Sequence, residues 1–187
     1  MCPVNSKAGV IFPRKFNGKY ALMLTVYPDL PPSRIYLVYF DKISDLKDPE
    51  FWKNVLSYPE REEAEIVLEG KQGKEFVEVG STPIELDDFW LMFIPDIVYE
   101  NGEFKSFRIS AMVLDKEDPS KVLGFTKKPL LYPKVEYERL FNSPIEGIAF
   151  PSGALIDDDI VEVYYGAADR YICKAYITVE ELMKYIT

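Results

Sequence analysis

The residues best suited to chemistry stand near the end of Gly147–Arg170, the stretch around which the chain is organised. There Tyr164 and Tyr165 lead through three small residues to Asp169. The glycine and two alanines let the backbone approach another group closely, and the acid that follows accepts hydrogen bonds from it. We therefore predict a polar ligand at this strand end, bound by Asp169. The alternative is a turn aspartate that accepts hydrogen bonds from local backbone N–H groups.

The choice of other catalytic groups is narrow because the chain contains no histidine. Ser-His-Asp and Cys-His catalysis within the chain are excluded, and so is a metal held by histidine. The run Asp157–Asp159 has the oxygen ligands that calcium prefers, but a hairpin turn accounts for it without an ion. Asp29 and Asp96 follow predicted strands and are weaker binding candidates, and Lys7 is interpreted as a solvated terminal lysine. We predict no metal and no cofactor.

Composition favours a folded β-protein with an acidic surface. The 187 residues are 48% hydrophobic and 14% aromatic, and they carry 14 prolines and a formal net charge of −9. No stripe of Lys or Arg is present, so nucleic acid and anionic membranes are poor partners. The two cysteines make no disulfide framework, and no run of about 18 apolar residues is present. We expect a cytoplasmic, soluble protein without a membrane partner.

Alternation of apolar and polar residues between turn residues predicts mostly strands. Asn17-Gly18 marks a hairpin turn, and Thr178 with Glu181 has the spacing of a helix capping box. The expected strands cover 8–12, 20–27, 34–41, 64–68, 76–86, 89–97, 106–114, 148–156, 160–165 and 171–177, and the expected helices cover 49–56, 118–120 and 179–185.

A proline-containing strand followed by a turn and an apolar strand occurs three times, at Pro13, Pro83 and Pro151. The prolines are 70 and 68 positions apart, and a fixed period with several strands per unit indicates a β-propeller. The alternative is a β-sandwich whose strands are alike by chance. We expect one all-β domain over 1–187, with blade-like units at about 8–68, 76–132 and 145–177 and a short C-terminal helix.

Several segments, in this order and spacing, are similar to one known family. They are Asn5–Pro13 with Asn17–Ala21, Pro83-Ile84 with Trp90-Leu91, Met112–Val122, Pro129–Pro133 with Tyr137–Arg139, Phe150–Gly153 and Tyr164–Asp169. Together they resemble the β-1,4-mannooligosaccharide phosphorylase family, glycoside hydrolase family 130. The resemblance implies a five-bladed β-propeller, of which this chain matches the three C-terminal blades.

The departures from the family pattern concern the catalytic groups. The resemblance implies that the general-acid Asp lies in N-terminal blades outside this chain. The basic and polar residues expected at the phosphate site fall on Leu24–Val26, Phe76, Pro95 and Gly147. Because phosphate needs fixed donors to displace its water, this replacement predicts that phosphorolysis is lost.

In the family pattern the position of Asp169 contacts the sugar at the mouth of the propeller. The resemblance therefore implies a site for a β-mannoside-like carbohydrate formed by Asp169, Tyr165, Phe150 and Asp96. One hypothesis is a glycoside-active or carbohydrate-binding protein without phosphorolysis. The other is a non-catalytic subunit that completes a propeller with another chain. Because propellers need about four to eight blades, three leave sheet faces uncovered, which predicts a homo-oligomer or a partner chain with the missing blades.

Overall fold

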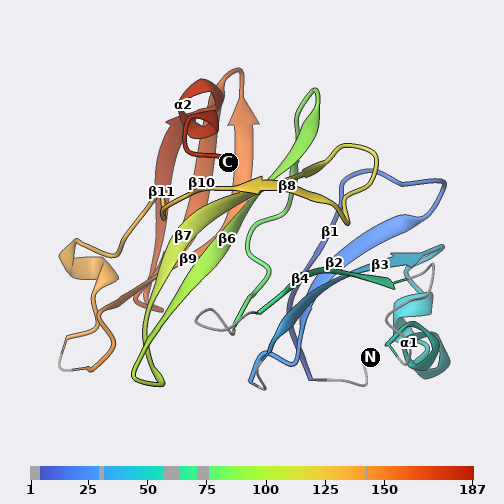
Figure 1. Ribbon diagram of the computed structural model, residues 1–187, viewed down its shortest axis with the longest axis horizontal. Helices are drawn as coiled ribbons and strands as arrows, with labels where there is room; N and C mark the ends of the chain where they lie inside the picture. The colour runs from blue at the N-terminus through green and yellow to red at the C-terminus, as the bar shows by residue number, and fades with distance from the viewer. Residues whose placement is uncertain (1–4, 30–31, 57–63, 71–75, 142) are drawn as a thin grey trace. The chain divides into compact units, whose positions relative to one another are not determined.

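The structure is a computed structural model that describes residues 5–29, 32–56, 64–70, 76–141 and 143–187, and most of its elements are strands (Figure 1). The chain divides into two compact units. The first contains Met1–Val79 and Glu117–Lys121, and the second contains Gly80–Lys116 and Val122–Thr187. Within the described ranges, no helix has the length and apolar character needed to cross a membrane.

The first unit is a four-stranded antiparallel sheet in the order β1-β2-β3-β4. Asn17 and Gly18, both with positive φ, form the hairpin turn between the first two strands, as this residue pair favours. The amphipathic helix α1 packs Trp52 and Val55 against the buried Tyr36 of the sheet. The strands are β1 (Ser6–Ile11), β2 (Tyr20–Val26), β3 (Arg34–Phe40) and β4 (Ala64–Glu69), and the helices are η1 (Asp45–Lys47) and α1 (Pro49–Leu56).

A β-bulge interrupts β1 between Lys7 and Gly9. Ala8, inside the bulge, has a φ of 46°, in the left-handed region that costs a non-glycine residue roughly 1–2 kcal/mol. A bulge bends its strand and redirects the neighbouring side chains. The backbone is therefore strained at Ala8, directly after Lys7.

The second unit contains a seven-stranded sheet with the path β11-β10-β9-β7-β6-β5, and β8 pairs with β7 beside this path. The long hairpin β6–β7 is joined to β9 by a parallel pairing in which Ser106 is opposite Gly147. The strands are β5 (Ile84–Glu85), β6 (Phe89–Glu100), β7 (Glu103–Asp115), β8 (Val122–Phe125), β9 (Gly147–Asp157), β10 (Ile160–Ala167) and β11 (Tyr171–Thr178), with a 3-10 turn η2 (Glu136–Glu138) and a helix α2 (Val179–Met183).

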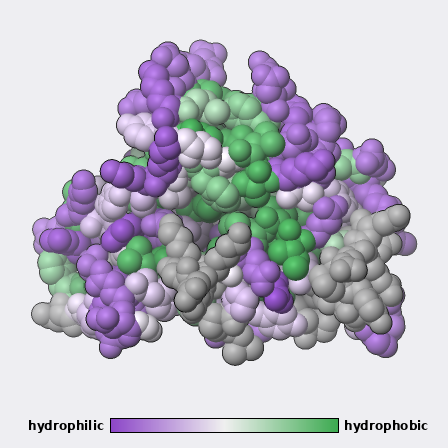
Figure 2. Space-filling view, viewed as in Figure 1, coloured by the Kyte–Doolittle hydropathy of each residue, from purple (hydrophilic) through white to green (hydrophobic). Residues whose placement is uncertain are grey.

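The core of the second unit joins one face of β9–β11 to β6 and β7. Strand alternation sends Val161, Val163 and Tyr165 of β10 into this core, where Leu182 of α2 also packs. The apolar alternate positions of the sequence thus become one buried layer. Figure 2, which shows surface atoms only, has hydrophobic as well as hydrophilic side chains on the viewed face.

The all-β class is confirmed, and most predicted strands are found within a few residues of their expected bounds. Helix α1 has the predicted bounds, whereas α2 ends at Met183 and not at Tyr185. The predicted helix 118–120 is wrong, because Asp118 accepts from the backbone and hydroxyl of Ser120 in a tight turn. The predicted strand 76–86 is reduced to β5, and β8 was not predicted. The sheets are not closed, and the three-blade division stays a prediction.

Candidate functional site

Asp169 is the middle residue of the three-residue turn, Ala168–Arg170, between β10 and β11. Ala168 and Asp169 have φ values of 49° and 55°, and the N–H of Arg170 donates to the carbonyl of Ala167 at 3.0 Å. This is the backbone of a tight hairpin turn, in which Asp is one of the few side chains tolerated. Asp169 is exposed, so its carboxylate is open to a ligand. The turn and the binding interpretation are both compatible with this geometry.

Tyr165 is buried, with 4% of its surface exposed. Its hydroxyl donates to Oε1 of Glu138 at 2.8 Å, while the backbone N–H groups of Lys134 and Val135 donate to Oε2 of the same carboxylate. Burial, with the hydrogen bond to Glu138, raises the pKa of Tyr165 well above its ordinary value. The phenol therefore joins η2 to the sheet, and it faces the packed side of β10.

The other two predicted residues, Phe150 and Asp96, lie on β9 and β6 of the second unit. Phe150 is opposite Gly166 in the register and packs its ring edge-to-face with Phe107, with 5.3 Å between the centroids. Because neighbouring strand residues point to opposite faces, Phe150 and Tyr165 lie on different faces of the sheet. Asp96 lies on β6, opposite Arg108. Phe150 and Tyr165 thus lie on the strand pair that leads to Asp169, but on opposite faces, and the grouping of all four residues stays a prediction.

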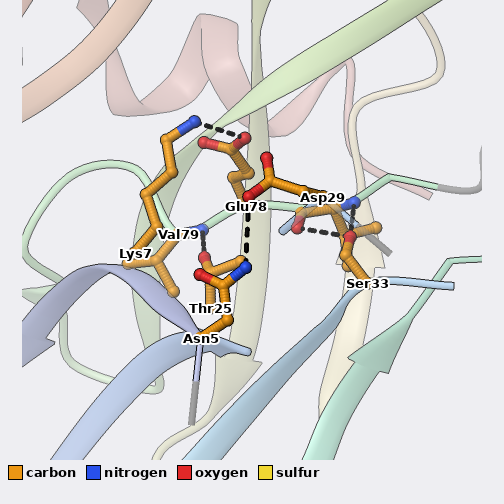
Figure 3. Close-up of polar contacts among 8 residues, drawn as sticks. Asn5, Lys7, Thr25, Asp29, Ser33, Glu78 and Val79 are labelled. Carbon is orange, nitrogen blue, oxygen red and sulfur yellow. Dashed lines mark hydrogen bonds and ion pairs between the residues drawn. The ribbon is translucent and has the colours of Figure 1, made fainter. Parts of the chain in front are cut away.

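A polar cluster that the sequence analysis did not assemble occupies the first unit (Figure 3). The ammonium of Lys7 donates to Oε1 of Glu78 at 2.9 Å, and the two side chains point toward one another. The Lys7 side chain is 51% exposed, whereas the Glu78 side chain is only 7% exposed. Within the described part of the chain, Oε2 of Glu78 is buried and has no hydrogen-bond partner.

Backbone hydrogen bonds fix the segment that carries Glu78. The N–H of Val79 donates to the hydroxyl of Thr25 at 2.8 Å, and Thr25 is opposite Lys7 in the β1–β2 register. The N–H of Val77 donates to the hydroxyl of Ser33, which returns a bond to the carbonyl of the same residue. Both neighbours of Glu78 are therefore anchored, so the carboxylate is positioned in advance.

Another polar pair and a groove lie close to the Lys7–Glu78 pair. The amide of Asn5 donates to Asp29 at 3.1 Å, next to the start of β1. Lys7 also lines a groove of about 220 Å³ together with Ser6, Ala8, Gly9, Leu22, Leu24 and Trp52. Among the described residues no group of three metal-ligating side chains is found. The arrangement offers an ammonium donor, a buried carboxylate oxygen without a partner, and an apolar groove beside them.

The sequence alone gives no signal that groups Lys7 with Asp29 or that singles out Glu78. The alternation Val77-Glu78-Val79 is typical of any half-exposed strand, in which the glutamate is solvated. Its contact with Lys7 joins residues 71 positions apart in the chain. No local pattern carries that information.

The comparisons with known proteins agree with this all-β architecture. The β-1,2-mannobiose phosphorylase of Listeria innocua, solved as a complex with β-1,2-mannobiose, superposes with a TM-score of 0.72 at 24% identity. That match covers 97% of this chain and 46% of the Listeria chain. The solved structures that this chain resembles are five-bladed-propeller-like. The fold thus places the chain among propeller-like proteins.

The family model described as beta-1,4-mannooligosaccharide phosphorylase, glycoside hydrolase family 130, matches residues 1–187. The chain belongs to this family. It is 31% identical over 185 residues to the 1,2-beta-oligomannan phosphorylase of Thermoanaerobacter sp. (strain X514), and 31% identical over 185 residues to the beta-1,4-mannooligosaccharide phosphorylase of Ruminococcus albus. These matches cover 52% and 50% of the two relatives, so the chain spans about half their length.

Proposed function

We propose that this chain binds a β-mannoside-like carbohydrate and does not perform phosphorolysis. The observation that carries the proposal is the buried Glu78 carboxylate beside Lys7, one oxygen of which has no hydrogen-bond partner among the described residues. A carboxylate accepts hydrogen bonds from sugar hydroxyls, and an unpartnered buried acceptor gains most from such a donor. Family membership supports a carbohydrate as the ligand, because its relatives are mannoside phosphorylases.

The same cluster disfavours phosphate. The ammonium of Lys7 already lies 2.9 Å from a carboxylate, which would repel a phosphate dianion. Thr25, among the residues where the family's Arg is expected, is fully buried and its hydroxyl accepts from Val79. Phe76 and Pro95 offer no side-chain donor at the other expected positions. A glycoside hydrolase or a binding protein therefore fits better than a phosphorylase.

The first prediction is that the purified chain releases no mannose 1-phosphate from β-1,2- or β-1,4-linked manno-oligosaccharides in phosphate buffer. The physical reason is that Thr25, Phe76 and Pro95, at the positions where phosphate donors are expected, have no cationic side chain. The measurement is product analysis with and without phosphate. Phosphate-dependent release of mannose 1-phosphate would overturn the proposal. Binding of the same oligosaccharides by calorimetry is the expected positive result, and its absence would count against carbohydrate binding.

The second prediction concerns Asp169, which remains the leading candidate in the second unit. Asp169→Asn keeps the side-chain shape and tolerates the left-handed backbone, so the melting temperature should stay unchanged. If Asp169 binds the sugar, affinity should fall by roughly 1–3 kcal/mol, the size expected for a charge-assisted hydrogen bond. Titration of both proteins with manno-oligosaccharides measures this. Equal affinities would assign Asp169 to the turn alone.

A non-catalytic role in an assembly is the second candidate function. It is supported by the sheets, which do not close among the described residues. The two roles differ in a direct test: hydrolysis of a manno-oligosaccharide by the purified chain supports an enzyme, and binding without turnover supports a subunit.

A further inference from the structure

The outer edge of β11 is an open sheet edge. This strand ends the seven-stranded sheet, and among the described residues no other strand pairs with its outer side. Its eight residues pair with β10 without a bulge, and Lys174 is the one charged residue among them. Ile172 is 89% exposed and Tyr176 is 63% exposed. A long, regular, mostly apolar edge strand is a template for pairing with another strand.

The other strands that end the two sheets have features that limit pairing, and β11 shares only one of them, a single charged residue. A bulge interrupts β1, and β4 carries Glu65 and Glu69. Strand β5 contains only two residues and follows Pro83. Bulges, charges, prolines and short length are the usual means by which edge strands avoid pairing. Strand β11 has one of them, the charge of Lys174, and that ammonium is already held by Glu162 and by the ring of Tyr164 in the same sheet, so most of this edge is open to pairing.

We propose that β11 pairs antiparallel with β11 of a second copy of this chain, about a two-fold axis through Ala175. Antiparallel pairing continues the pattern of the neighbouring strands, because β9, β10 and β11 pair in this direction. A two-fold axis perpendicular to the sheet produces the same direction between two copies. Main-chain hydrogen bonds along the strand supply the association.

The side chains of β11 select this register. Residues directly opposite each other in an antiparallel pair point to the same face, so the axis must pass through a residue and not between two. An axis at Lys174 would set two ammonium groups opposite each other, which is unfavourable. An axis at Ala175 sets each Lys174 opposite Tyr176 of the other copy, and Cys173 opposite Ile177.

The Lys174–Tyr176 pairing across the axis extends a contact that exists within one chain. Lys174 already lies over the rings of Tyr164 and Tyr176, at 5.7 and 5.0 Å from their centroids, and it donates to Glu162 at 2.8 Å. A second tyrosine ring adds another favourable face for the same ammonium. The small Ala175 pair at the centre allows the two strands to approach closely.

Cysteine cross-linking tests the register directly. In a Cys2→Ser, Cys173→Ser background, Ala175→Cys puts two thiols opposite each other, at the Cα separation that disulfides accept. Mild oxidation should convert most of this variant to a cross-linked dimer. Leu155→Cys is the matched control, because Leu155 is 61% exposed on β9, away from the edge. Equal cross-linking of the two variants at the same concentration would overturn the proposed register.

The native mass tests the association without a cross-link. The full chain should have about twice its 21.6 kDa mass by light scattering at micromolar concentration. Ile172→Lys should weaken the dimer by about tenfold or more, because a charged side chain at the edge opposes strand pairing, whereas Leu155→Lys should leave it unchanged. Circular dichroism confirms that both variants fold. A monomer at all concentrations, or equal effects of the two lysines, would contradict the proposal.

Discussion

Glu78→Gln should weaken carbohydrate binding by at least tenfold while leaving the fold intact or slightly more stable. The buried carboxylate has one oxygen paired with Lys7 and one without a partner in the described chain, so its burial is only partly compensated. Removing the charge removes that cost, which should raise the free energy of unfolding by up to about 1 kcal/mol. The lost charge-assisted hydrogen bond to the ligand should cost about 1.5–3 kcal/mol of affinity.

Lys7→Met should have the opposite effect on stability. It leaves the Glu78 carboxylate buried without its cation, and this should lower the free energy of unfolding by about 1–3 kcal/mol, less than for a fully buried pair because Lys7 is half exposed. Urea unfolding and calorimetric titration measure the two quantities. If the ion pair is purely structural, both substitutions should lower the free energy of unfolding and leave affinity unchanged. That result would refute a binding role for Glu78.

The control for both substitutions is the exposed pair Arg34–Glu69 of the same sheet. Its atoms are 3.0 Å apart, like those of Lys7 and Glu78, but both side chains are considerably exposed. Glu69→Gln should change stability by less than about 1 kcal/mol and leave binding unchanged, since exposed ion pairs contribute little. A shift in affinity with this variant would indicate a general charge effect and not a site.

Local patterns were sufficient to predict most elements. Asn17-Gly18 marks its turn because both residues accept positive φ, and Asp48 accepts the N–H of Glu50 at the start of α1, as the sequence indicates. The alternation in β10 correctly separates Val161 and Val163 from their exposed neighbours. These features depend on residues within a few positions of each other, so a single sequence contains them.

Features that depend on distant residues could not be predicted. The parallel pairing of Ser106 with Gly147 joins strands 41 positions apart, and no periodicity reports which strands meet. The same holds for Tyr165, whose hydroxyl partner Glu138 lies in a 3-10 turn 27 positions earlier. Strand alternation requires that one of two adjacent tyrosines faces inward, but it does not determine which one. Family resemblance supplied the fold class that local patterns left open between propeller and sandwich.

Gly80→Ala should destabilise the second unit by about 3 kcal/mol, the upper range for overpacking a rigid site. An added Cβ would lie 2.1 Å from the carbonyl oxygen of Phe93 and 2.9 Å from Cγ of Pro151. The close approach is fixed because the N–H of Ser81 donates to that carbonyl, and the N–H of Phe93 donates to the hydroxyl of Ser81. Backbone on one side and a proline ring on the other leave no flexible group that can move aside.

Gly153→Ala is the matched control for this clash, because it lies on β9 of the same unit and an added Cβ meets nothing within 4 Å. It should raise the free energy of unfolding by about 0.5 kcal/mol, since alanine loses less backbone entropy than glycine in a strand. Urea unfolding of both variants, followed by tryptophan fluorescence, measures the difference. Trp90 reports on the same unit because its side chain is fully buried there. Equal stability of the two variants would mean that the segment at Gly80 does not pack against β6, which would remove the anchor for the chain that follows Glu78.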